Sequence, residues 1–195
     1  KVSICATEMM ESMRTNHRPT RAEVADVAGA VREGFSAVML SAETATGYDP
    51  INAVSAMARI CDANETHDGH KSFADAHPTE SAVGAATAAL AKRTGASSII
   101  ALTYSGYSSE ILSACRPAAQ IIAATPSHET ARRLRLYWGV TPLVCQRDVD
   151  MNVAVDDAFN AALDAGLVQF NELVVVCASR ENIRSAADTI WVHNA

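Results

Sequence analysis

The chain of 195 residues is 49% hydrophobic and 5% aromatic, which is enough for one medium or two small domains with packed cores. Its 16 lysines and arginines and 22 aspartates and glutamates give a net charge of −6, and because no basic stretch is interleaved with aromatic residues, neither nucleic acid nor an anionic membrane is an expected partner. No apolar run approaches the roughly 20 residues of a membrane-spanning helix, and the first residues lack the apolar stretch of a secretion signal, so we predict a cytoplasmic protein.

The first third of the chain alternates strand and helix patterns. Residues 2–6 and 37–40 are short runs of small, apolar or β-branched residues, which predict two buried parallel strands. Between them a helix is predicted over residues 21–32, with Gly34 as its stop signal. A second helix is predicted from Pro50 to about Asn64. Its expected inward face consists of Ile51, Val54, Met57, Ala58 and Cys61.

A polar segment over residues 64–78 separates this part from the rest. It contains a group of possible metal ligands, namely His67, His70, His77, Asp68 and Asp75. A metal site is one interpretation, but a solvated linker fits this loop-like composition better.

The remaining residues repeat the alternation and predict a separate α/β domain with a mainly parallel sheet. Strands are predicted over residues 98–102, 120–124, 141–145, 173–178 and 189–192. Helices are predicted over residues 80–93, 109–115, 127–137 and 151–167. The first of these helices is expected to turn Val83, Ala86, Thr87 and Leu90 inward.

Ligands of parallel α/β folds bind at the carboxyl ends of strands, where two segments of this chain place a hydroxyl beside a carboxylate. Thr7 and Glu8 follow the first predicted strand, and Ser41 and Glu43 follow the second. Such pairs can orient a substrate, relay protons or bind a phosphate. Considered alone, they are more typical of helix caps and loop-fixing groups.

Two further features concern binding and redox chemistry. Residues 103–108 (TYSGYS) offer hydroxyls, a glycine and backbone N–H groups just before a helix, which suits either a phosphate cradle or a simple turn and cap. The cysteines are odd in number, widely spaced and set in apolar surroundings, so buried reduced thiols are expected and a thiol-based redox protein is a remote alternative.

Several strings are more specific than these patterns. Segments 4–13 (ICATEMMESM), 18–23 (RPTRAE), 38–45 (VMLSAETA) and 50–61 (PINAVSAMARIC) resemble, in order and spacing, the carboxyl-terminal part of the pyruvate kinase barrel. Segments 101–106 (ALTYSG), 115–117 (CRP), 121–125 (IIAAT) and 137–142 (YWGVTP) resemble the C domain of the same family. The resemblance implies the end of a (β/α)8 TIM barrel over residues 1–65, a linker over 66–78, and a three-layer α/β domain with a mostly parallel five-stranded sheet over 79–195.

The resemblance implies transfer of the phosphoryl group of phosphoenolpyruvate to ADP, with Mg²⁺ and K⁺, in a homotetrameric enzyme. The metal-binding carboxylates, the K⁺ ligands, the phosphate-facing lysine and the lid domain lie earlier in full-length members. Two strands cannot close a barrel, and Lys1 opens directly into a strand, so we expect a piece of a longer enzyme without turnover of its own. The alternative is a free-standing regulatory module that has lost catalysis.

The resemblance also implies roles for individual residues of the barrel segment. Thr7 follows the seventh barrel strand and contacts substrate, whereas Ser41 and Glu43 follow the eighth, where the enolate is protonated. The loop and helix start that contain Arg18 and Arg21 border the pocket and a neighbouring subunit. This sequence departs from the family at Glu8, where glutamine is usual and a negative charge is added, and at Ala42, where many members have glycine.

In the C domain, the resemblance implies that a phosphorylated effector binds Thr103, Ser105, Gly106 and Ser108. A second effector loop corresponds to residues 179–185, which here lack glycine but carry Arg180 and Arg184. Tyr107 replaces a basic residue common in the family and removes a charge-assisted contact. A sugar-phosphate or nucleotide effector is therefore expected, with fructose 1,6-bisphosphate a poor candidate.

Overall fold

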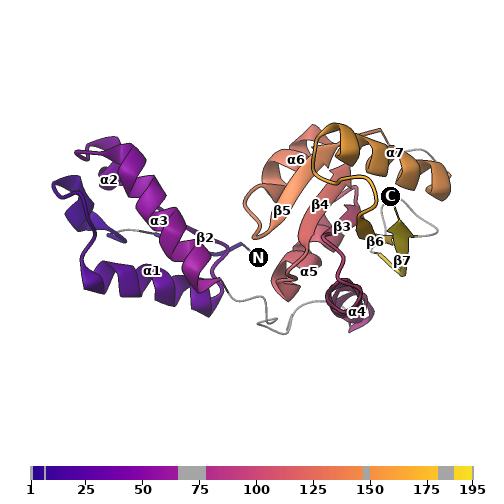
Figure 1. The fold of residues 1–195 in the computed structure, drawn as a ribbon, viewed down its shortest axis with the longest axis horizontal. Helices are drawn as coiled ribbons and strands as arrows, with labels where there is room; N and C mark the ends of the chain where they lie inside the picture. The colour runs from indigo at the N-terminus through magenta and orange to yellow at the C-terminus, as the bar shows by residue number, and fades with distance from the viewer. Residues whose placement is uncertain (1, 7, 66–77, 147–149, 180–186, 195) are drawn as a thin grey trace. The chain divides into compact units, whose positions relative to one another are not determined.

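The computed structural model describes residues 2–6, 8–65, 78–146, 150–179 and 187–194. The chain divides into two compact units, Lys1–Thr66 and His67–Ala195 (Figure 1). Thr7, Arg180 and Arg184 and the histidines of the predicted linker lie outside the described residues. Within the described ranges, no helix combines the length and apolarity needed to cross a membrane.

The first unit is built from two short strands, one 3-10 helix and three α-helices among its described residues. Its elements are β1 (Ile4–Cys5), the 3-10 helix η1 (Glu11–Arg14), α1 (Arg21–Glu33), β2 (Ala37–Val38), α2 (Ala42–Ala45) and α3 (Pro50–Asn64). The strands pair in parallel, with Ile4 opposite Ala37. Helix α1 ends at Glu33 and is followed by Gly34, whose φ of 84° is the left-handed conformation that suits glycine after a helix.

Both strands of this unit are shorter than predicted. Each has two residues, whereas the sequence indicated strands over 2–6 and 37–40. Ile4 is 47% exposed rather than buried. In the described part of the unit each strand has one partner, and a two-stranded ladder gives less backbone pairing and less cover than a larger sheet.

The core of the first unit lies between α1, α3 and the segment after β1. It contains Met9, Met10, Met13, Val27, Ala30, Ala53, Ala56 and Met57. The predicted inward face of α3 was therefore wrong for Ile51, Val54 and Ala58, which are exposed, and right for Met57 and for Cys61, which is partly buried against this core. Ile51 is 80% and Val54 54% exposed. Helix α3 carries apolar residues on more than one side. The side that is buried holds the small residues Ala53 and Ala56, which share a core with Val27 and Ala30 of α1.

The second unit forms a three-layer α/β fold, as predicted. Its elements are α4 (Pro78–Thr94), β3 (Ser98–Leu102), α5 (Tyr107–Cys115), β4 (Gln120–Thr125), α6 (His128–Leu134), β5 (Val140–Val144), α7 (Met151–Asp164), β6 (Leu173–Ala178) and β7 (Thr189–Asn194). The sheet has the order β5-β4-β3-β6-β7, and only β7 is antiparallel.

Both faces of this sheet are buried, which explains the continuous apolar runs of its strands. Ile99 and Ala101 pack with residues of α4 and α5, whereas Ile100 and Leu102 face α7 (Figure 1). Strand β3 pairs with β4 on one side and β6 on the other, although β4 comes next in the chain and β6 comes much later. The chain thus reverses its direction of winding at β3, the position where open α/β sheets commonly bind ligands at the carboxyl ends of the strands.

The helices of the second unit differ from prediction in detail. Helix α5 begins at Tyr107, two residues early, while α6 and α7 end three residues early. Ala86 is exposed, contrary to prediction, and Thr87 is fully buried and donates a hydrogen bond to the carbonyl of Val83. Bonding its hydroxyl within the helix lets a threonine face the sheet at a position where its polarity costs little.

Candidate functional site

A buried carboxylate joins the segments that follow the two strands of the first unit. Glu43, in α2, is 1% exposed. Its Oε1 accepts a hydrogen bond from the Met10 N–H at 3.2 Å, and its Oε2 accepts one from the Ser41 N–H at 2.7 Å. Glu43 therefore holds the segment after β1 to the segment after β2, across 33 positions of sequence.

These hydrogen bonds determine the charge state of Glu43. Burial alone raises the pKa of its carboxyl, but the backbone N–H groups of Glu43, Ser41 and Met10 together lower the pKa below its usual value. N–H donors favour the ionised form of a carboxylate. Glu43 is thus an anion at neutral pH, and its oxygens are directed at the backbone.

A second carboxylate fixes the segment between η1 and α1. Glu23 accepts hydrogen bonds from the backbone and the hydroxyl of Ser12, at 2.7 and 2.5 Å, and from the backbone and hydroxyl of Thr20, at 2.7 and 2.9 Å. Burial raises and these donors lower the pKa of Glu23, with a net shift below its usual value. Thr20 and Glu23 form a capping box, which the Thr-x-x-Glu spacing could have indicated.

The other barrel-segment candidates lie at the surface. Ser41, Glu8, Arg18 and Arg21 are all exposed. Glu8 has a φ of 52°, in the left-handed region that is costly for residues other than glycine. Of the predicted catalytic residues, the structure brings Ser41 and Glu43 into direct contact through the Ser41 N–H.

In the second unit, the segment 103–108 forms a compact turn at the carboxyl end of β3. Thr103 is 4% exposed, and its Oγ1 accepts the Gly106 N–H at 2.9 Å. Ser105 is exposed, and its Oγ accepts the Tyr107 N–H at 3.4 Å. Gly106 has a φ of 88°, so its lack of a Cβ permits the turn into α5.

Helix α6 holds this turn from outside. The guanidinium of Arg133 donates a hydrogen bond to the Ser105 carbonyl, and the Thr130 hydroxyl donates one to the Tyr104 carbonyl at 3.0 Å. Arg133 also lies 3.5 Å from the carboxylate of Glu110 on α5. Burial, together with a hydrogen bond to Glu110, raises the pKa of Tyr137 to about 12.

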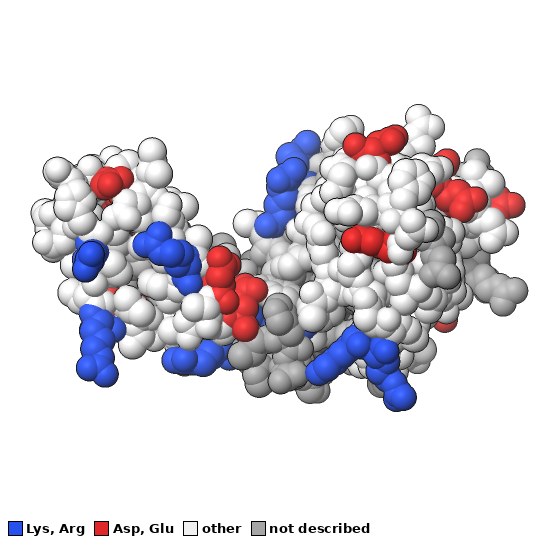
Figure 2. All heavy atoms as spheres, viewed as in Figure 1, with Lys and Arg blue, Asp and Glu red and all other residues white. Residues whose placement is uncertain are grey.

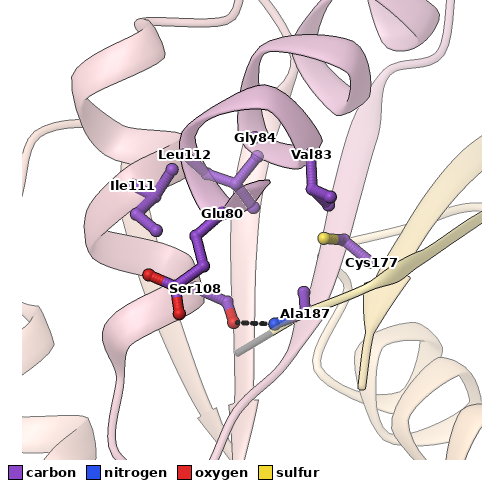
Figure 3. Close-up of a pocket in the computed structure, with 8 residues that line it drawn as sticks. All are labelled: Glu80, Val83, Gly84, Ser108, Ile111, Leu112, Cys177 and Ala187. Carbon is purple, nitrogen blue, oxygen red and sulfur yellow. Dashed lines mark hydrogen bonds between the residues drawn. The ribbon is translucent and has the colours of Figure 1, made fainter. Parts of the chain in front are cut away.

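Ser108 points away from the turn into a small cavity between α4, α5 and β6. Its Oγ accepts the Ala187 N–H at 3.2 Å, and Glu80 extends toward the same side (Figure 3). The cavity volume of about 10 Å³ corresponds to roughly one water molecule. Ser108 therefore links α5 to the segment that precedes β7. Of the predicted effector residues that the structure describes, Ser105 has an exposed side chain.

Two buried hydroxyls near the carboxyl ends of β3 and β6 have no hydrogen-bond partner among the described residues. They belong to Ser109, in the first turn of α5, and Ser179, which follows β6. Buried hydroxyls normally find a partner. Their presence beside the reversal in winding marks this end of the sheet as the place to look for a ligand.

Charged side chains and possible metal ligands are found across the described residues. Charged side chains on the face seen in Figure 2 are scattered in small groups among uncharged ones. Within the parts of the chain that the structure describes, no three His, Cys, Asp or Glu side chains come together as a metal site would require. These residues therefore do not fit a bound metal.

Comparison with family models decides the relationship. The model of the pyruvate kinase barrel domain matches residues 1–54, and that of the pyruvate kinase alpha/beta domain matches residues 81–193. The chain belongs to the pyruvate kinase family. The two strand-end segments described above thus lie in the region matched by the barrel model, and the turn at 103–108 lies in the region matched by the alpha/beta model.

Individual pyruvate kinases align with most of this chain. A pyruvate kinase of Agrobacterium vitis is 41% identical over 182 residues, 90% of this chain and 38% of that protein. A pyruvate kinase of Clostridium acetobutylicum is 38% identical over 184 residues, which are 91% of this chain and 39% of that protein. Pyruvate kinase 2 of Synechocystis is 38% identical over 192 residues, which are 97% of this chain and 32% of that protein. The chain thus spans between about a third and two-fifths of the length of these relatives.

Proposed function

We propose that this chain contributes to transfer of the phosphoryl group of phosphoenolpyruvate to ADP in the cytoplasm, giving pyruvate and ATP. The observation that carries the proposal is the Glu43 bridge. It fixes the ends of two parallel strands, where α/β barrels place their catalytic groups, and the exposed Ser41 lies on one of the bridged segments.

In this proposal, Ser41 and Thr7 face the substrate, and Glu43 positions the segments that carry substrate-facing groups. Protonation of an enolate needs a donor held in a fixed place, and a hydroxyl whose backbone N–H is anchored meets that need. The left-handed backbone of Glu8 supports the same assignment, because backbone strain tends to be retained where it serves a site. Arg18 and Arg21 border the pocket and a neighbouring subunit of a homotetramer.

Phosphoryl transfer requires cations that neutralise the phosphoryl oxygens, a role that Mg²⁺ and K⁺ have in the proposed reaction. Since the described residues do not fit a metal, the proposal assigns them no step through either ion. We therefore expect no phosphoenolpyruvate-dependent ATP formation by the purified 195-residue chain with ADP, Mg²⁺ and K⁺. Turnover above that of a heat-denatured control would contradict the proposal that this chain needs the rest of the enzyme for catalysis.

The second unit has a proposed regulatory function. We propose that its turn at 103–108, with Arg180 and Arg184 from the sequence after β6, binds a phosphorylated effector. The buried hydroxyls of Ser109 and Ser179, at the sheet end where the winding reverses, support a ligand there. If calorimetry found unchanged effector binding by a variant carrying Ser105→Ala and Arg184→Ala, this site would be abandoned.

A further inference from the structure

The turn proposed to bind phosphate has no charge of its own. Residues 103–108 are threonine, tyrosine, serine and glycine only. We propose that Arg133, from α6, supplies the positive charge with which this turn binds a phosphate monoester. This role of Arg133 rests on the proposed effector site, and it explains why that site would prefer an anion.

The position of Arg133 against the turn is the first support. Its guanidinium donates to the Ser105 carbonyl, so it touches the residue at the tip of the turn. A Cβ added at Gly106 would lie 3.0 Å from the same Nη2 atom. The guanidinium therefore packs directly against the turn, 28 positions along the chain from Ser105.

The remaining hydrogen-bond capacity of Arg133 is the second support. Its side chain is 53% exposed. In the described part of the chain, both polar contacts of its guanidinium, to Ser105 and Glu110, are made by Nη2. An arginine has five N–H donors in a planar fork that matches the oxygens of a phosphate, so Nη1 and Nε can serve a ligand while Nη2 holds the turn.

The hydroxyl groups of the turn explain why a positive charge must come from another element. The Thr103 and Ser108 hydroxyls already accept the N–H groups of Gly106 and Ala187, and both side chains are buried. Ser105 offers the exposed hydroxyl, directly beside the carbonyl that Arg133 holds. A charge-assisted bond from arginine is about twice as strong as a neutral one.

Neighbouring arginines provide a control for long-range attraction. Basic side chains gather over α6 and the adjacent edge of the sheet (Figure 2). Arg132, next to Arg133 in α6, is exposed, and within the described residues no hydrogen bond or ion pair joins its side chain to the turn. Replacement of Arg132 by glutamine changes the net charge as much as replacement of Arg133, but leaves the turn untouched.

The test is an NMR titration of the full 195-residue chain with inorganic phosphate, at constant ionic strength set with sodium chloride. We expect saturable amide shifts in residues 103–110, with binding at least about tenfold weaker in Arg133→Gln, as the loss of a charged hydrogen bond predicts. Arg132→Gln should stay within about twofold of wild type, since an exposed charge that makes no hydrogen bond to the turn contributes little through water. Arg133→Lys, which keeps the charge but loses the planar fork, should recover part of the affinity. Amide dispersion before titration identifies any variant that fails to fold.

Each contrary result has a distinct meaning. If phosphate shifts residues 103–110 equally in wild type and Arg133→Gln, the assignment of Arg133 is wrong while the effector site stands. If Arg132→Gln weakens binding as much as Arg133→Gln, the effect is long-range attraction and the assignment is again wrong. The same holds if Arg133→Lys binds as weakly as Arg133→Gln. If wild type shows no saturable shift in residues 103–110, both the proposed site and the inference fail.

Discussion

Glu43 illustrates how backbone hydrogen bonds can stabilise a buried carboxylate. In the described structure its oxygens are satisfied by backbone N–H groups at the ends of two strands. Removing an ion from water is costly, and it is tolerated when hydrogen bonds replace the lost hydration. The residue therefore fixes backbone geometry, and its charge is a by-product of the donors around it.

Replacing Glu43 with glutamine tests this role. In Glu43→Gln, an amide NH₂ can face one of the two N–H donors, which leaves a buried donor unsatisfied. We expect the first unit to lose about 1–3 kcal/mol of stability. Because both tryptophans, Trp138 and Trp191, lie in the second unit, the loss should be measured by native-state hydrogen exchange of residues 8–45. Glu8→Gln, at an exposed position, is the matched control and should leave exchange unchanged.

The same carboxylate predicts the pH dependence of the first unit. The folded-state pKa of Glu43 is lowered, so its contribution is present above the unfolded value of 4.5 and is lost as pH falls through the folded value. Glu23 acts in the same direction. Exchange protection in wild type should therefore decline with acid below about pH 4.5. Glu43→Gln should show a smaller decline, and an identical decline in both proteins would contradict the assignment.

The thiols differ in their expected reactivity. Cys177 is 1% exposed, and burial raises its pKa to about 11. The thiolate is the reactive form, so Cys177 should be the slowest of the described cysteines to react with a disulfide reagent at neutral pH. Mass spectrometry of labelled peptides over time would show this order. Early labelling of Cys177, before Cys5 or Cys145, would mean that β6 opens readily.

Among elements, the close packing of α4 against α5 can be tested at Gly84. A Cβ on Gly84 would lie 2.4 Å from the Cγ2 methyl of buried Ile111. Because a β-branched methyl has little freedom to move, Gly84→Ala should destabilise the second unit by about 1–3 kcal/mol in urea titrations followed by tryptophan fluorescence.

The control for this substitution is Gly29→Ala in α1, where nothing lies within 4 Å of the added methyl group. There the expected effect is neutral or stabilising by up to about 1 kcal/mol, since alanine restricts the unfolded chain and favours helix. It is measured by hydrogen exchange of α1. A stabilising Gly84→Ala would show that α4 and α5 are separated more widely than described.

The sequence predicts features that depend on neighbouring residues, such as strands, better than contacts between residues far apart in the chain. Strands β3 and β6 match their predicted bounds because continuous apolar runs ended by polar residues define a strand buried on both faces. The inward face of α3 could not be read, because Ile51 and Ala53 both lie on apolar stripes and only the packing against α1 selects between them. The Glu43 bridge and the Arg133 contact join residues 33 and 28 positions apart, and no spacing rule indicates such pairs.

At the scale of the whole molecule, the two units have different sources of stability. The second unit has a five-stranded sheet buried on both faces, whereas the first has a two-stranded ladder and a core of methionine, alanine and valine side chains. Small sheets with one strand pair are marginal on their own. We therefore expect faster hydrogen exchange before residue 64 than in β3, and equal protection of both units would contradict this expectation.

The most direct test of the proposed role in phosphoryl transfer is a chimaera. In it, this chain replaces the aligned segment of the Agrobacterium vitis pyruvate kinase, to which it is 41% identical. We predict phosphoenolpyruvate-dependent ATP formation by the chimaera, which falls in its Ser41→Ala variant. A folded chimaera that forms no ATP would contradict the account and favour a regulatory module that has lost catalysis.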